Sequence, residues 1–184
     1  MNVTLKYVAI ESRHLHHTIV TWVRVPPEIA FAYVADITRH NEWASDEINV
    51  TPLTPGSVQF GSKYTVVGRQ GGKDWPSQLE VTIYEPPHRF AFTATGGPIG
   101  TPEGDPHRHE FLFTTKNDGT ELEVRRTDPA APNWPSWFFK LFASLIMPIL
   151  IRGRRIGTIE RLRTRLDELA TTQSPSTCAA TGIG

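Results

Sequence analysis

The fold of this chain is decided near its C-terminus by the run WFFKLFASLIM, residues 137–147. Most of its residues are apolar, on nearly every face of a helix, as is typical of a helix that other parts of a protein bury. Beyond it, apolar residues recur at spacings of three, four and three: Ile159, Leu162, Leu166 and Leu169. Arginines lie between them, which is the pattern of an amphipathic helix that packs on another layer. We therefore predict one long helix over Trp134–Leu169, buried in its first half and amphipathic in its second.

The sequence upstream of this helix predicts short β-strands separated by turns. The run HTIVTWVRV, residues 17–25, is rich in β-branched residues and predicts the first strand. Further strands are expected at 48–53, 63–69, 78–84, 89–95, 107–115 and 121–127. The last two are joined by Lys116–Gly119, whose Asn, Asp and Gly suit a hairpin turn. Consecutive strands with short connections form an antiparallel meander, so the fold class is α+β with about six to seven strands.

Two short helices are expected after the first strand. Proline suits the first turn of a helix, and an early carboxylate favours its N-terminal dipole, so Pro26-Pro27-Glu28 begins the first one. That helix ends near Asp36, and a second short helix leads to Trp43. We divide the chain into an N-terminal extension (1–16), one folded domain (17–171) and a small polar tail (172–184) that we expect to be disordered.

The composition excludes some classes of protein. The chain has 184 residues, with 19 basic and 19 acidic side chains, and lacks the basic excess of a nucleic-acid binder. The only cysteine is Cys178, so no internal disulfide can form, which is typical of a reducing compartment. Residues 1–20 contain no apolar signal segment, and the apolar run over 137–151 is shorter than the roughly 20 residues that span a bilayer. We expect a soluble, cytoplasmic protein.

Three motifs resemble one known superfamily. They are VPPEIAFAYVAD (25–36) followed by Trp43, EVTIYEPPHRF (80–90) and DGTEL (118–122). Over Thr18–Leu169 the chain resembles the helix-grip superfamily, also called SRPBCC, START-like or birch-pollen-allergen-like, which includes the polyketide cyclases/dehydrases. The resemblance implies a curved antiparallel sheet wrapped around a long C-terminal helix. It does not determine function, because the superfamily includes aromatase/cyclases, lipid and sterol carriers, hormone receptors and chaperone cofactors.

The register of the last predicted hairpin brings four polar residues together. With the turn at Lys116–Gly119, position 113 lies opposite 122 and position 111 opposite 124. The large apolar side chains of this hairpin should face the helix. The same register places His109 opposite Arg126 and His107 opposite Asp128. The inner face of the hairpin therefore becomes polar at its open end.

This cluster permits several interpretations. A His107–Asp128 pair is able to act as a general acid or base, and Arg126 to hold a carboxylate or an enolate, with His109 beside them. Such a site would suit a cyclase or dehydratase that needs neither a metal nor a nucleotide cofactor. The plainer alternative is a polar pocket mouth that meets water. Two histidines at i and i+2 with Asp128 also suit a metal ion, but no further ligand is evident and we predict none. Glu80 and Glu110 fall on the outer face, where we expect solvated charges.

We predict an apolar pocket between the sheet and the helix. Its expected lining is Trp43, Val81, Phe92, Phe111, Val124, Trp137, Leu141, Phe142 and Leu145. The first functional hypothesis is binding of a small hydrophobic or amphipathic molecule, namely a lipid, a polyketide or an aromatic metabolite. The second is the cyclase or dehydratase. The third is a peripheral membrane or partner-binding module that uses the basic helix around Arg152, Arg154 and Arg155. The alternative to this third hypothesis is that the basic face of the helix is simply exposed to solvent. The protein is expected to be a monomer or a homodimer.

Pro148, Gly153 and Gly157 predict a bend within the helix.

Overall fold

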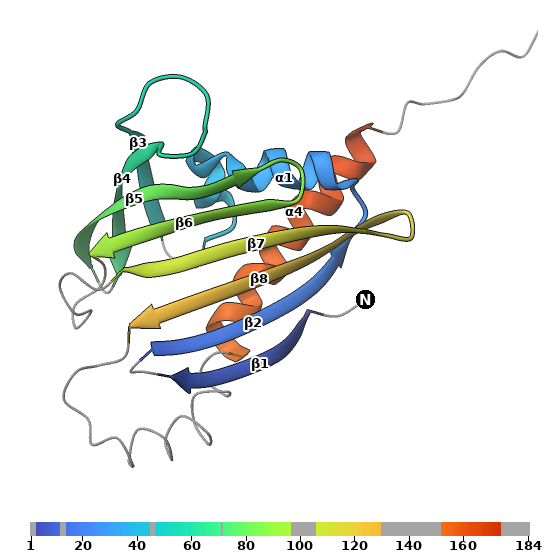
Figure 1. Ribbon diagram of the computed structural model, residues 1–184, viewed down its shortest axis with the longest axis horizontal. Coiled ribbons are helices and arrows are strands. Elements are labelled where there is room, and N and C mark those ends of the chain that lie inside the picture. Colours follow the sequence, from blue (N-terminus) through green and yellow to red (C-terminus); the bar gives the residue numbers. More distant parts are fainter. Residues whose placement is uncertain are drawn as a thin grey trace, which may run out of the picture.

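The computed structural model describes residues 3–11, 14–44, 47–70, 72–96, 106–129 and 152–173. Within these ranges it contains one sheet of eight strands in the order β1-β2-β8-β7-β6-β5-β4-β3. The strands are β1 (Thr4–Glu11), β2 (His14–Val23), β3 (Glu47–Pro52), β4 (Lys63–Gln70), β5 (Lys73–Glu85), β6 (Arg89–Gly96), β7 (His107–Lys116) and β8 (Gly119–Pro129). All neighbouring strands are antiparallel. The predicted α+β class and the meander over β3–β8 are confirmed (Figure 1).

The sheet has one strand more than the sequence predicted. The additional strand, β1, lies in the N-terminal extension expected at 1–16 and pairs with β2 along the edge of the sheet. Val3 and Leu5 pack against the core from this edge. Strand β2 begins at His14, so the expected boundary at residue 17 falls inside a strand. Residues 3–11 therefore extend the sheet rather than precede the domain.

Two short helices follow β2, as predicted. They are α1 (Pro27–Ala35) and the 3-10 helix η1 (Ile37–Glu42). Asp36 lies between them, and its carboxylate accepts from the backbone N–H of Thr38 at 3.2 Å, which caps η1. Phe31 of α1 packs edge-on against Tyr84, Phe90 and Phe113, with ring centroids 5.3 to 6.2 Å apart. These rings fill the space between the sheet and α1 at this end of the molecule.

The C-terminal helix lies on the sheet. Its described part comprises a π-helical turn, η2 (Arg152–Ile156), followed by α4 (Gly157–Gln173). Ile159, Leu162 and Leu166 are buried in the core, which confirms the amphipathic pattern. The apolar stripe of α4 therefore faces the protein and not an outside surface. Among the described residues, no helix has the length and apolar character needed to cross a membrane. The predicted pocket wall at 137–147 and the proposed bend at Pro148 lie outside the described ranges.

Candidate functional site

The register predicted for the last hairpin is confirmed. Phe113 pairs with Leu122, Phe111 with Val124 and His109 with Arg126. One step further, the ring of His107 donates from Nδ1 to Asp128 Oδ1 at 2.9 Å. The alternation of apolar and polar residues along β7 and β8 thus produces an apolar inner face with a polar end.

Asp128 is the centre of this polar end. Its Oδ1 also accepts from Arg126 Nε at 2.5 Å, and its Oδ2 accepts from Arg155 Nη2 at 3.3 Å. The residue is only 8% exposed. Burial alone would raise the pKa of Asp128, but the Arg126 guanidinium, the bond from His107 and the Arg155 guanidinium together hold it far below its usual range. The carboxylate therefore stays ionised inside the fold.

Two other histidines near this carboxylate, His17 and His109, have lowered pKa values. Burial, and next the Arg126 guanidinium, lowers the pKa of His109 well below its ordinary value. The His109 ring stacks on Phe92, with centroids 4.6 Å apart and planes 14° from parallel. His17 of β2 lies beside them, and burial lowers its pKa to about 4, although the Asp128 carboxylate acts in the opposite sense. The neutral imidazoles of His17 and His109 thus lie near a charged group of one carboxylate and two guanidinium ions.

A second buried histidine group lies at η1. His40 donates from Nε2 to the carbonyl oxygen of Val34 at 2.8 Å, and burial lowers its pKa to about 4. Its ring packs on Trp43, with centroids 4.6 Å apart. Trp43 in turn meets Phe111 edge-on at 6.4 Å. These contacts connect η1 to the inner face of β7.

The polar cluster around Asp128 and the His40–Trp43 pair border one cavity of about 260 Å³ between the sheet and the helices. Four of the residues predicted to line a pocket do so: Trp43, Phe92, Phe111 and Val124. Val81 does not, because its side chain is 0% exposed and packed within the core. The helix residues predicted as lining, Trp137, Leu141, Phe142 and Leu145, lie outside the described ranges. His107, His109 and Arg126 line the same cavity at its polar end.

A family model described as "Polyketide cyclase / dehydrase and lipid transport" matches residues 14–167. The chain belongs to this family. The match covers nearly all of the sheet together with both flanking helical regions, so the family assignment applies to the whole pocket. It agrees with the helix-grip architecture of the SRPBCC superfamily. No curated protein matches the chain.

Solved structures share the family's fold at low sequence identity. A protein from Mycobacterium smegmatis, Ms6760, aligns over 92% of this chain and 99% of its own, with a TM-score of 0.58 and 18% identity. Ara h 8.0201 aligns over 83% of this chain and 97% of its own, with a TM-score of 0.60 and 12% identity. The di-domain ARO/CYC StfQ of the steffimycin biosynthetic pathway aligns over 86% of this chain and 52% of its own, with a TM-score of 0.63 and 11% identity. At these identities the likeness concerns the fold alone.

Several lining residues of this family member were not predicted from the sequence. They are His17, Ile19, His40, Leu79, Ala94, Arg155 and Ile159. His17 pairs with Arg126 across β2 and β8, two strands far apart in the sequence. A weak signal for it was present, because His17 opens the first predicted strand and alternates with Ile19. Trp75 also lines the cavity, with its ring packed over Gly68.

The polar end does not form a metal site among the described residues, where no three His, Cys, Asp or Glu side chains are grouped to hold an ion. Asp128 accepts from two guanidinium groups. Two positive charges at the same carboxylate disfavour a metal cation there.

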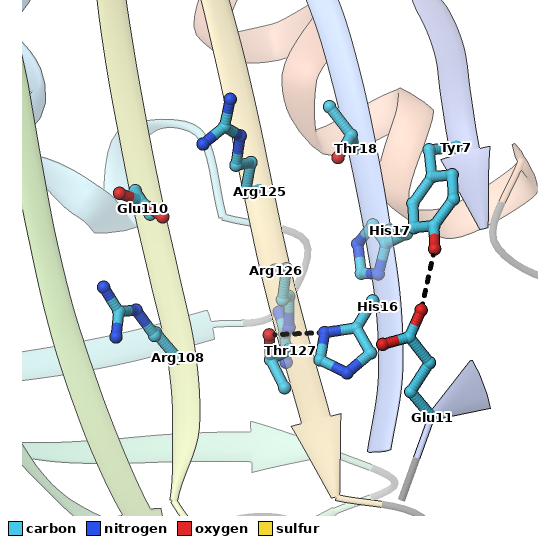
Figure 2. Close-up of a pocket in the computed structure, with 10 residues that line it drawn as sticks. All are labelled: Tyr7, Glu11, His16, His17, Thr18, Arg108, Glu110, Arg125, Arg126 and Thr127. Atoms are coloured by element: carbon cyan, nitrogen blue, oxygen red, sulfur yellow. Dashed lines mark hydrogen bonds between the residues drawn. The ribbon is translucent and has the colours of Figure 1, made fainter. Parts of the chain in front are cut away.

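A second hollow, of about 300 Å³, lies on the outer face of the sheet (Figure 2). Its lining is polar and of mixed charge, and it includes a hydrogen bond between His16 and Thr127 at 3.0 Å. Glu110 lies here, on the outer face as predicted. It is not a solvated charge, however, because it is 8% exposed and pairs with Arg89 at 2.6 Å. Local ion pairs of this kind account for the outer face, so we place the functional site on the inner one.

Proposed function

We propose that this protein binds a small hydrophobic or amphipathic molecule, either a lipid, a polyketide or an aromatic metabolite, in the cavity between the sheet and the C-terminal helix. The observation that carries the proposal is the cavity itself, whose aromatic and aliphatic walls end in the polar cluster around Asp128. Ligand sites in proteins have this composition, with apolar walls that supply affinity and a few polar groups that orient the ligand.

The comparisons support the same class of ligand. The description of the family names polyketide cyclisation or dehydration and lipid transport. StfQ is described as an ARO/CYC protein of a biosynthetic pathway. These descriptions concern the relatives. For this chain they favour hydrophobic molecules over nucleotides, sugars or nucleic acids.

In this proposal Trp43, Phe92, Phe111 and Val124 contact the apolar part of the ligand, and the cluster around Asp128 contacts its polar part. Trp137, Leu141, Phe142 and Leu145 would complete the wall. The protein would act in the cytoplasm, as a monomer or a homodimer. Transport and storage need no more than this, because a carrier has only to cover its ligand and release it.

Native mass spectrometry of the protein purified from its own host tests the proposal. We expect an apolar small molecule to leave the folded protein on collisional activation. Phe111→Trp enlarges a side chain that lines the cavity and should reduce the bound fraction. Phe60→Trp is the matched control, because Phe60 is 73% exposed and outside the cavity. Protein free of any bound molecule, or equal loss of ligand in both variants, would count against the proposal.

The oriented His107–Asp128 pair favours catalysis as a second candidate function. A carboxylate that accepts from Nδ1 fixes the imidazole so that Nε2 is available for proton transfer. The guanidinium groups of Arg126 and Arg155 would stabilise a developing enolate oxygen. His107→Ala should then abolish cyclisation or dehydration of a poly-β-ketone substrate while its dissociation constant changes by less than about tenfold. Turnover that survives this substitution would remove the enzyme hypothesis and leave the binding hypothesis in place.

A further inference from the structure

The cavity is bordered by two helical elements that are far apart in the sequence. Trp43 and Ala44, which follow η1, line it on one side, and Thr158 and Ile159 of α4 line it next to them. Arg161, three residues after Thr158 on the same helix, is exposed to solvent. Lining residues and solvent-exposed residues thus lie within one helical turn of each other. We call the line along which these two elements meet the η1–α4 seam.

Arg161 bridges this seam. Its Nε donates to the carbonyl oxygen of Trp43 at 3.2 Å, and its Nη2 lies 3.5 Å from the hydroxyl oxygen of Thr158 on its own helix. Hydrogen bonds from an ionised donor are stronger than those between neutral groups. Because Trp43 also lines the cavity, the same residue borders the ligand space and is held by an exposed guanidinium. The position of this part of the wall therefore depends on the Arg161 contact.

The two elements of the seam pack mainly on other parts of the protein. The apolar stripe of α4 lies on the core, where its main strand neighbour is β2. The 3-10 helix η1 packs on β3, and its buried His40 bonds to Val34 of α1. The eight strands, in contrast, are joined by backbone pairing throughout the sheet. Within the described residues, the seam is a part of the wall that can open without breaking a strand pairing.

We propose that the η1–α4 seam is the entrance through which the ligand reaches the cavity, and that Arg161 is the positioning residue that holds it closed. When the guanidinium leaves the Trp43 carbonyl, η1 can move away from α4, which opens the cavity beside Thr158 and Ile159. Gating of this kind changes how fast a ligand enters and leaves, and leaves its affinity nearly unchanged. This inference rests on the proposed function and specifies where the ligand passes.

Stopped-flow fluorescence with N-phenyl-1-naphthylamine tests the inference. This probe is apolar and uncharged, so removal of an arginine outside the cavity does not change its affinity by charge. Arg161→Met removes the donors and keeps a long side chain. We expect both the association and the dissociation rate constants to rise about tenfold, as loss of a hydrogen bond from a charged group implies. The dissociation constant should change by less than about twofold, because both directions pass through the same opening.

Two further variants make the test specific. Arg161→Lys keeps a charged donor and should restore most of the slow exchange. Arg165→Met is the matched control, because Arg165 is an exposed arginine one turn further along α4 whose guanidinium pairs with Glu168 of the same helix at 3.0 Å. It should leave both rate constants unchanged. If Arg161→Met does not fold, Arg161→Gln replaces it, and both rate constants should again rise together.

Unchanged rate constants in the Arg161 variants would overturn the inference. Equal acceleration in Arg165→Met would also overturn it, because the whole helix would then be loosened. A rise in the dissociation rate constant alone would show that Arg161 contacts the ligand rather than closing an entrance. Failure of the probe to bind overturns the inference as well, whereas the proposed function is judged separately by the molecule that co-purifies with the protein.

Discussion

Mild acid should destabilise the fold through its buried histidines, since the lowered pKa of His109 acts in the same direction as those of His17 and His40. His17 and His40 have a pKa of about 4 in the folded protein, against an ordinary value of 6.5. As the pH falls through 6.5, the unfolded chain takes up protons at these positions and the folded chain does not. Stability is therefore complete above the ordinary histidine pKa and is lost progressively down to a pH of about 4.

The size of this effect follows from the two pKa values. Near pH 5, His17 and His40 each favour the unfolded chain by about 2 kcal/mol, because pH 5 lies about one and a half units below the ordinary histidine pKa and still above their pKa in the folded chain. Together they amount to about 4 kcal/mol, a large share of the roughly 5–15 kcal/mol that keeps a domain folded. The pKa of Asp128 is lowered, so loss of its stabilising charge belongs to a more acidic range.

Urea unfolding followed by tryptophan fluorescence, between about pH 7.5 and pH 5, measures this loss directly. His40→Gln should reduce it by about 2 kcal/mol, because glutamine can still donate to the carbonyl of Val34 but does not titrate. His88→Gln, at an exposed position, should keep the full pH dependence. A free energy of unfolding that stays constant over this range would refute the reasoning, as would an unchanged slope in His40→Gln.

Three further predictions concern stability and exchange. Asp128→Asn should lower the free energy of unfolding by about 3 kcal/mol in the same urea titration, because Arg126 and Arg155 lose a buried partner. The control Asp74→Asn, at an exposed pair with Arg69, should change this free energy by less than about 1 kcal/mol. Equal effects of the two substitutions would contradict the role of burial. Leu162→Ala should cost about 2–5 kcal/mol, since this side chain is fully buried between α4 and the sheet; a shift of the urea midpoint no larger than that of an exposed substitution would show that the helix does not pack as described. Gly153→Ala combined with Gly157→Ala should stabilise the helix by about 1 kcal/mol per position, because an added methyl meets no close neighbour. The double variant should also slow ligand release in stopped-flow displacement. An unchanged release rate would argue against a bend between η2 and α4 that controls exchange.

The fold was largely predictable because its local signals are strong. The hairpin turn at Lys116–Gly119 fixed the register of β7 and β8, and Asn117 adopts the left-handed φ of +55° that such turns favour. Strand β1 was left unassigned, because no glycine or proline marks a turn between it and β2. The start of β5 was placed too late, because Pro76 indicates a break. Proline is tolerated there because β6 reaches only as far as Ser77, so Pro76 has a strand on one side alone.

The candidate site was predictable only where it depends on neighbouring strands. The arrangement of His107, His109, Arg126 and Asp128 follows from one hairpin and from alternation along it. The positions of His17 and Arg155 depend on how distant segments meet, since β2 and the C-terminal helix approach β8 from opposite ends of the chain. Short-range patterns carry no information about such pairings. The depth at which His40 is buried likewise depends on the packing of η1 over the sheet.

Arg155 belongs to the π-helical turn, yet its guanidinium contacts Asp128 on β8, the same carboxylate that orients His107. One side chain thus fastens the helix to the sheet and also sets the chemistry of the pocket. Neutralising that carboxylate would weaken two contacts at once, the ion pair with Arg155 and the hydrogen bond that orients His107. The orientation of His107 in the pocket and the position of the C-terminal helix therefore depend on the same carboxylate, so a substitution at Asp128 should change both.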